Sequence, residues 1–298
     1  MRESHGIVVV GGVFREILDG DSSPRHRYGG SGLISAIAAS RMGTQTTLVS
    51  FVGAEDAEAV RRLLDAGGVD STRLMVLPGA SGTFVFPTDG EGSARPWPMY
   101  RPAEATPRRV PSIPSANVYV IFGAPGFDAI AAGWLRTINA DAWVVWDRQG
   151  WLSRARDSSG AARLAAKHKV YLANAEEVCE ELRVGSVDEA ILRLPDLGFH
   201  GAVVKLGSRG CLVLEAARGW RVHAVPGHPL VATSTVGSGD VFAGAIAAEL
   251  ARDRTLLESA TTANAVAAAY LLQEKDVLAE SLSSTAEALV RASTSSST

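Results

Sequence analysis

The sequence predicts an α/β fold in which a doubly wound, mostly parallel sheet is flanked by helices and carries a small β lid. Short β-branched runs recur along the 298 residues, helix-periodic segments fill most of the intervals between them, and two intervals match neither pattern. We therefore expect a single domain over residues 1–298, with lid segments inserted at about 13–28 and 78–114.

The expected strands are continuous apolar runs, a pattern typical of strands covered on both faces. They span residues 6–12, 46–53, 117–123, 142–147, 169–174 and 201–207. Because parallel strands end at one edge of their sheet, a ligand is expected in the crevice outside those carboxyl ends.

The expected helices lie between these strands. They span residues 32–43, 57–68, 127–138, 159–168, 175–184 and 186–198. Asn174 and Ser186 precede the last two, and both residue types are favoured N-caps. The alternation of strand and helix indicates parallel pairing, because each parallel connection needs a long crossover.

The two irregular segments predict the lid. Residues 78–114 hold eight of the 13 prolines, a density that edge strands and loops accept but central strands do not. Within them, residues 81–102 predict a hairpin around the turn TDGEG. We interpret both segments as a small β lid over the ligand site, although a pair of long surface loops fits the pattern nearly as well.

Composition indicates a cytoplasmic protein that binds a small molecule. The net charge of −3 does not indicate a basic surface that would bind nucleic acid or an anionic membrane. No segment holds the 18 consecutive apolar residues that a membrane-spanning helix requires. Cys179 and Cys211 lack the spacing of a metal site and are expected to be buried free thiols.

The stretch TSTVGSGDVFAGA, residues 233–245, carries a chemical signal. Gly237, Ser238 and Gly239 precede Asp240 and an alanine-rich helix. The first N–H groups of a helix lack partners and form a ready anion site. A carboxylate at that point either caps the helix or takes part in chemistry.

Three further stretches accompany it: YGGSGLISAIAASRMG at 28–43, NAEEVCEEL at 174–182 and VVKLGSRGCLVL at 203–214. In this order and at these distances they resemble the ribokinase (pfkB) family of carbohydrate and nucleoside kinases, over roughly residues 6–275. The resemblance implies a ribokinase-like fold and transfer of the γ-phosphoryl group of ATP, with Mg²⁺, to a hydroxyl of a small acceptor.

By the same resemblance, Asp240 is the general base that takes the acceptor's proton, and near a helix N-terminus we expect it to stay ionised at neutral pH. The N–H groups of Gly237, Ser238 and Gly239 are expected to form an anion hole for the transferred phosphoryl group. The simpler interpretation makes Asp240 a helix cap, and only the presence of the other stretches disfavours it.

The resemblance also assigns the nucleotide side. Glu177 is expected to organise the water shell of Mg²⁺, although a capped acidic helix explains NAEEVCEEL more simply. For Asn264, a buried helix is an equally good explanation. The residues expected to bind the nucleotide are Asn174, Lys205, Gly207, Ser208, Gly210, Thr235 and Asn264.

On the acceptor side, Glu16 stands where relatives have a sugar-binding Asp, while Phe14 and Ile34 replace two neutral polar residues. A buried sugar hydroxyl without a partner costs about 1–3 kcal/mol, so an acceptor with an apolar or aromatic part is favoured over an ordinary pentose. As an alternative, Glu16 is an exposed lid residue. The residues expected to bind the acceptor are Phe14, Glu16, Gly29, Gly30, Ile34 and Asp240.

Two other departures affect the expected chemistry. Ser234 replaces an Asp that helps to hold a monovalent cation in relatives, so potassium activation is not expected. Asp147, Arg148 and Gln149 follow a strand where relatives carry an Asp-x-Asn run, which indicates a position facing the site.

Three functions fit these residues. The first is a kinase acting on a sugar or sugar-like alcohol, and the second is a nucleoside kinase of the same fold, favoured by Phe14 and Ile34. The third is a nucleotide-binding or ligand-binding protein without catalysis, suggested by Ser234 but opposed by Asp240 and the intact glycine loop.

Relatives often dimerise through lid strands, and the strand SGTFVF is suited to do so. Four lid residues either cover a planar or anionic group or pack within the lid: Arg95, Trp97, Tyr100 and Arg101.

Overall fold

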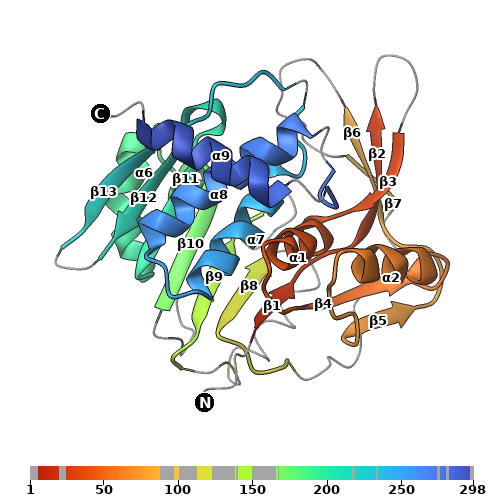
Figure 1. Cartoon of the computed structure of the whole chain (residues 1–298). Coiled ribbons are helices and arrows are strands. Elements are labelled where there is room, and N and C mark those ends of the chain that lie inside the picture. Colours follow the sequence, from red (N-terminus) through yellow and green to blue (C-terminus); the bar gives the residue numbers. More distant parts are fainter. Residues whose placement is uncertain are drawn as a thin grey trace.

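The computed structural model describes residues 6–19, 25–87, 97–100, 113–122, 138, 140–149, 166, 168–216, 219–232, 234–273, 276–279 and 282–295. These residues form a nine-stranded sheet covered by helices, with a second, four-stranded sheet standing beyond one end of it (Figure 1). The predicted fold class, a mostly parallel sheet flanked by helices with a small β lid, is confirmed.

The strands of the main sheet follow the order β13-β12-β11-β10-β9-β8-β1-β4-β5. The strands are β1 Ile7–Val10, β4 Thr46–Gly53, β5 Leu74–Leu77, β8 Val118–Phe122, β9 Trp143–Asp147, β10 His168–Asn174, β11 Gly201–Lys205, β12 Gly210–Glu215 and β13 Arg221–Pro226. All pairs from β4 to β11 in this order are parallel, as predicted, and β5, which was not among the expected strands, pairs parallel with β4. The antiparallel edge formed by β12 and β13 was not predicted. It begins because the turn Gly207–Arg209 is too short for a crossover.

The uniformly apolar strands are explained by burial on both faces of the sheet. In β1, Ile7 and Val9 pack into one core, while Val8 and Val10 pack into the other. Each core is closed by its own layer of helices, so neither face of this strand can accept polar residues.

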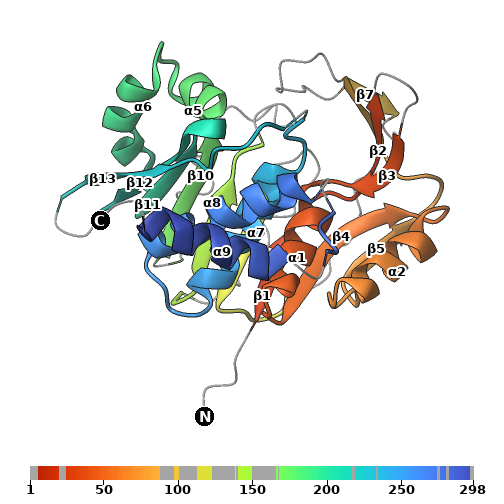
Figure 2. The ribbon, with the colours of Figure 1, turned by 45° about the horizontal axis from the view of Figure 1, so that its top comes forward.

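The helices cover the two faces in separate groups (Figure 2). On one face lie α1 Ser31–Arg41, α2 Ala57–Ala66, α7 Ser238–Leu250, α8 Leu256–Leu272 and α9 Leu282–Ser295. On the other face lie α5 Ala175–Leu182 and α6 Val187–Arg193. Buried alanines of α7 and α8 let these two helices pack closely against each other.

The predicted helix starts are confirmed where the structure describes them. Asn174 and Glu177 form a reciprocal capping box, and the Ser186 hydroxyl accepts the N–H of Glu189. The helix predicted for 186–198 is wrong beyond Arg193, where a 3₁₀ turn takes over at a proline that lacks an N–H. The helices predicted for 127–138 and 159–168 fall almost wholly outside the described residues.

The lid is a separate sheet with the strand order β3-β2-β6-β7. Its strands are β2 Phe14–Asp19, β3 Arg25–Gly29, β6 Thr83–Pro87 and β7 Trp97–Tyr100. The predicted hairpin is confirmed as the antiparallel β6–β7 pair, while its turn lies outside the described residues. Because β6 is paired on one side with β2 and on the other with β7, neither of its edges is open to a strand from a second copy, and dimerisation through the strand SGTFVF stays a prediction.

Cys211 is a buried free thiol as expected, whereas Cys179 is free but only half-buried, because α5 turns it toward the edge of its core. Within the described part of the chain, no helix has the length and apolar character that crossing a bilayer requires.

Candidate functional site

Strand ends of the main sheet bring the predicted site together. β9, β10 and β11 are parallel neighbours, so their last residues, Asp147, Asn174 and Lys205, lie at one edge. β1 lies between β4 and β8, where the strand order reverses direction. Such a switch point opens a crevice at the carboxyl ends of the strands.

Glycines allow α1 to approach the end of β1. The Gly32 N–H donates to the Gly12 carbonyl at 3.0 Å, and a Cβ added at Gly32 would lie 2.5 Å from the backbone of Gly11. Gly30 has a φ of 97°, a conformation that favours glycine. The Gly-Gly-x-Gly stretch therefore seats the start of α1 directly against the strand end.

Asp240 lies in the first turn of α7, directed toward the end of β9. The N-cap position of this helix belongs to Gly237, which has a φ of 87°. The Asp240 Oδ1 atom instead accepts a hydrogen bond from the Gln149 Nε2 atom at 3.3 Å. The geometry thus favours a carboxylate in the site over a helix cap.

The surroundings of Asp240 raise the pKa of its carboxyl group. Burial, followed by the charge of Asp147, raises the pKa of Asp240 to about 8, and the opposing effect of Lys205 is smaller. The expectation that Asp240 stays ionised at neutral pH is therefore wrong for the free protein. The helix dipole is worth about 0.3–1 kcal/mol, too little to offset desolvation beside a second carboxylate.

We expect kcat/KM to rise with pH up to about 8, because a general base must be deprotonated to act and the pKa of Asp240 is raised to about 8. Below that pH the rate should fall about tenfold per unit, since the deprotonated fraction falls in proportion. The profile is measured from pH 5.5 to 9.5 at saturating Mg²⁺. A flat profile between pH 6 and 8 would contradict this assignment.

Lys205 and Asp147 form a buried ion pair near Asp240. The Lys205 Nζ atom is 2.9 Å from the Asp147 Oδ2 atom, and the Asp147 side chain is 1% exposed. Burial raises the pKa of Asp147. Burial lowers the pKa of Lys205, but the combined effect of the carboxylates of Asp147, Glu177 and Asp240 is larger, so the pKa of Lys205 is raised. A Cβ added at Gly239 would lie 3.3 Å from Nζ, so the ammonium lies against the glycine turn.

Residues after β9 fix this edge of the site, as the run Asp147–Gln149 suggested. The Arg148 Nε atom lies 2.5 Å from the Glu181 carboxylate, and its Nη1 atom donates to the Glu177 carbonyl at 2.6 Å. Arg148 therefore ties α5 to the end of β9. Gln149 has a left-handed φ of 48°, from which its amide reaches Asp240.

The glycine turn offers two free amides. The Ser238 N–H already donates to the Thr235 carbonyl at 3.1 Å, and the Ser238 hydroxyl donates to the same carbonyl at 2.8 Å. Within the described residues, the N–H groups of Gly237 and Gly239 have no protein acceptor. The anion hole predicted from three amides thus has Gly237 and Gly239 available, and Ser238 supports the turn.

Glu177 is suited to a magnesium ion that keeps most of its waters. Its Oε2 atom accepts the Asn174 N–H at 2.8 Å, and its charge contributes to the pKa values of Asp147 and Lys205. No group of three metal-ligating side chains occurs in the described ranges. One carboxylate beside a triphosphate is sufficient, because Mg²⁺ commonly uses one or two carboxylates, waters and phosphate oxygens.

Of the residues predicted to bind the nucleotide, Gly207 and Ser208 lie in an exposed turn after β11, between Lys205 and Gly210. Gly207 has a φ of 62°, and Ser208 is exposed beside it. A Cβ added at Gly210 would lie 2.1 Å from the Val225 carbonyl, so Gly210 lets β12 lie against β13. The Asn264 Nδ2 atom donates to the Pro226 carbonyl at 2.9 Å, which ties α8 to the end of β13.

On the acceptor side, Glu16 is buried rather than exposed, so its interpretation as an exposed lid residue is wrong. Its Oε1 atom accepts the Gly30 N–H and its Oε2 atom accepts the Arg27 Nε–H, both at 2.8 Å. A Cβ at Gly29 would lie 2.2 Å from the Glu16 carboxyl carbon, which explains why a glycine occupies that position.

Phe14 and Ile34 give the acceptor side an apolar wall. The Phe14 ring packs edge-on against Phe84 with centroids 4.6 Å apart, and it also lies against the backbone of Gly30. Ile34 is buried, and its Cδ1 atom would lie 3.2 Å from a Cβ at Gly237. Both side chains therefore lie beside residues predicted to meet the acceptor or the phosphoryl group.

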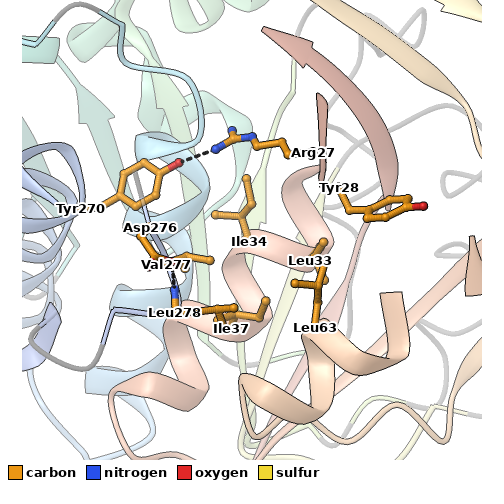
Figure 3. A pocket seen from close by; sticks show the side chains of 10 residues that line it. All are labelled: Arg27, Tyr28, Leu33, Ile34, Ile37, Leu63, Tyr270, Asp276, Val277 and Leu278. Carbon is orange, nitrogen blue, oxygen red and sulfur yellow. Dashed lines mark hydrogen bonds between the residues drawn. The ribbon is translucent and has the colours of Figure 1, made fainter. Parts of the chain in front are cut away.

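A cavity of about 330 Å³ opens beside the site rather than at it (Figure 3). Asp240 and the glycine turn do not line it. Arg27 and Tyr270 lie on its wall, and their side chains point toward each other above Ile34. The residues that line the cavity are Arg27, Tyr28, Leu33, Ile34, Ile37, Leu63, Tyr270, Asp276, Val277 and Leu278.

The described neighbours of Ser234 support the prediction that no monovalent cation binds there, which no observation tests directly. Ser234 is buried and neutral, and its hydroxyl lies 3.4 Å from the Val236 N–H. The Val236 carbonyl, a potential ligand, already accepts the Tyr270 hydroxyl at 3.2 Å. The Arg27 guanidinium lies within hydrogen-bond distance of that hydroxyl and would repel a cation.

We therefore expect turnover to change less than twofold when choline chloride is replaced by potassium chloride at constant ionic strength. Constant ionic strength is the control, because it keeps screening of the charged substrates unchanged. A strong stimulation by potassium alone would show that other oxygen atoms build a cation site.

Arg27 and Tyr270 were not predicted as site residues, because both lie in stretches that packing explains without any function. Gln149 was suspected from its neighbours but received no role. Of the lid residues proposed to cover the ligand, Arg95 and Arg101 lie outside the described residues, and only the backbone of the strand containing Trp97 and Tyr100 is described.

Comparisons with known proteins agree with this geometry. Residues 14–280 match the family described as pfkB family carbohydrate kinase. The aminoimidazole riboside kinase of Salmonella typhimurium is 25% identical over 80% of each chain. A Vibrio cholerae fructokinase structure with fructose, ADP and calcium superposes with a TM-score of 0.80 at 20% identity, covering 97% of this chain and 100% of that one. A Salmonella enterica aminoimidazole riboside kinase structure gives a TM-score of 0.74 at 19% identity, with 94% and 99% covered.

Proposed function

Because the chain belongs to the pfkB family of carbohydrate kinases, we propose that its acceptor is a riboside, a ribose unit carrying an apolar or aromatic group. As a member of this family, the chain is an ATP-dependent phosphotransferase that acts on an alcohol, with ATP and Mg²⁺ as its phosphoryl donor and metal. The expectation of a ligand-binding protein without catalysis is not supported. The proposal thus concerns the acceptor and the residue roles.

In the proposed mechanism, Asp240 takes the proton of the acceptor hydroxyl as that oxygen attacks the γ-phosphorus. The bond from the γ-phosphorus to the bridging oxygen breaks, and ADP leaves with the electron pair. Lys205 and the amides of Gly237 and Gly239 stabilise the negative charge on the transferred group. Mg²⁺, near Glu177, supplies further charge neutralisation when bound with ATP.

The apolar wall formed by Phe14 and Ile34 is the observation that carries the acceptor assignment. Both lie where a sugar would need polar partners, and each borders a backbone segment of the proposed site. A free sugar would leave hydroxyls unpaired there, at about 1–3 kcal/mol each. An aromatic or apolar substituent would bury the same surface favourably. One relative, by its name, acts on a riboside.

A free sugar is the second candidate, favoured by Glu16. Each oxygen of this carboxylate accepts one hydrogen bond from the protein. A carboxylate oxygen has two lone pairs, so one hydroxyl can still be accepted on each side. This arrangement suits a polar acceptor if the lid opens to admit it.

The two candidates are separated by kcat/KM for ribosides with planar substituents against ribose and fructose. We expect at least about a tenfold preference for ribosides, the scale of one well-filled apolar contact. Phe14→Asn should reduce that preference, whereas Phe14→Leu, which keeps an apolar side chain, should retain most of it. A free sugar phosphorylated as fast as any riboside would overturn the assignment.

A homodimer through the lid remains part of the proposal, now through β3. In the described sheet β3 is the first strand of the order, so one of its edges is unpaired and can add a strand from a second copy. Light scattering should show a dimer, and His26→Pro, at an exposed position on β3, should weaken it. A monomer at micromolar concentration would contradict this interface.

A further inference from the structure

A chain of hydrogen bonds joins the lid sheet to the turn before Asp240. The Arg27 Nε–H donates to Glu16 at 2.8 Å, which links β3 to β2. The Arg27 Nη1–H donates to the Tyr270 hydroxyl on α8 at 3.3 Å, and that hydroxyl donates to the Val236 carbonyl at 3.2 Å. Figure 3 shows the guanidinium and the phenol facing each other.

The last bond of this chain orients a peptide plane. A trans peptide is planar, and its C=O and N–H point in opposite directions. By holding the Val236 carbonyl, Tyr270 also directs the Gly237 N–H, one of the two free amides of the turn. A Cβ added at Gly237 would lie 2.6 Å from the Tyr270 oxygen, so the hydroxyl packs directly against the turn.

Stability alone does not account for these polar residues. The Arg27 Nη2 atom is buried and has no hydrogen-bond partner in the described part of the chain. An unpaired buried donor costs about 1–3 kcal/mol, and apolar residues often replace buried polar networks without loss of stability. The arrangement is therefore better explained by what it does to the turn than by what it adds to the fold.

We infer that Arg27 and Tyr270 are positioning residues for phosphoryl transfer, which hold the Val236–Gly237 peptide with its N–H toward the transferred group. Through Glu16 they also connect this peptide to the lid strand on the acceptor side. The inference rests on the proposed function, because it gives the Gly237 amide its task. Neither residue contacts the reacting atoms in this scheme.

Tyr270→Phe tests the inference with the loss of one oxygen atom. Tyr28→Phe is its matched control, because Tyr28 lines the same cavity and its hydroxyl donates to Asp56 instead of the turn. We expect Tyr270→Phe to lower kcat at least about tenfold, the scale of a misplaced catalytic group, with KM for ATP within twofold. Tyr28→Phe should change kcat less than twofold. Equal kcat values for the two variants would overturn the inference.

Arg27→Met and the double variant Arg27→Met/Tyr270→Phe test whether the two residues act as one unit. We expect the kcat of the double variant to be no lower than the kcat of the less active single variant, because either change already breaks the chain of hydrogen bonds. Arg27→Lys should recover part of the loss, since it keeps the charge. Losses that multiply in the double variant would show independent roles and contradict the inference.

Hydrogen exchange separates this inference from the proposed function. The amides of Ser238 and Val241, which donate to the Thr235 and Gly237 carbonyls, should exchange at least about tenfold faster in Tyr270→Phe than in Tyr28→Phe, because the turn loses its anchor. This readout needs no acceptor. Unchanged exchange would refute the positioning role even if the kinase is active. Faster exchange in a protein that phosphorylates no acceptor would refute the proposed function alone.

Discussion

We expect Asp240→Asn to abolish measurable turnover while the variant still binds ATP. The amide has nearly the same shape but cannot take the acceptor's proton, so the loss should fall on kcat, by about 10²–10⁴-fold. ATP affinity, measured by calorimetry with Mg²⁺, should stay within threefold, since Asp240 serves the acceptor. Turnover within a few-fold of the parent would show that another group is the base.

The same variant should be more stable than the parent at high pH. The pKa of Asp240 is raised from its ordinary value of 3.8 to about 8, so the folded state binds this proton more tightly than the unfolded state does. The free energy of unfolding of the parent should then fall as pH rises from about 4 to about 8 and level off above. Asp240→Asn removes this decline. Urea denaturation of both proteins at pH 5 and pH 9 measures the difference, which should be larger at pH 9.

Lys205→Met should cost both activity and stability. It leaves the buried Asp147 without its partner, and breaking a buried pair in this way typically costs about 3–5 kcal/mol. It also removes the cation that lies against Gly239, so kcat should fall at least about 10²-fold, as for other lost electrostatic contacts to a transition state. Steady-state kinetics and urea denaturation measure the two effects separately.

The double variant Asp147→Asn/Lys205→Met is the matched control for stability. It removes both charges, so it should regain a large part of the lost unfolding free energy while remaining inactive. If Lys205→Met alone is fully stable, Asp147 is protonated or solvated and the pair is not structural. If the double variant regains activity together with stability, Lys205 has no direct role in transfer.

The fold could be predicted because its strands are buried on both faces. Continuous apolar runs such as Ile7–Val10 alternate with capped helices, and few other architectures accept that pattern. The antiparallel pairing of β12 and β13 was missed because apolar strand patterns do not encode strand direction. The end of α6 at Arg193 depended on local competition between α and 3₁₀ geometry, which periodicity does not resolve.

Site residues were predictable where backbone chemistry restricts the choice of residue. Gly237 needs a positive φ, and Gly29 and Gly32 allow close approaches, so these positions leave a signal in the sequence. Arg27 and Tyr270 leave none, because they are 243 positions apart and meet only through the packing of β3 and α8. The raised pKa of Asp240 likewise depends on burial and on the charge of Asp147, which the fold brings near it from the end of β9.

The central claim is that Asp240 and Lys205 support phosphoryl transfer from ATP to an alcohol. ³¹P NMR tests it most directly, by following MgATP with the protein and a mixed set of ribosides and sugars. We predict that the γ-phosphate signal is replaced by a phosphomonoester signal in step with ADP formation, and that Asp240→Asn shows neither. ATP that stays intact, or that yields only inorganic phosphate at the same rate in both proteins, would contradict the account.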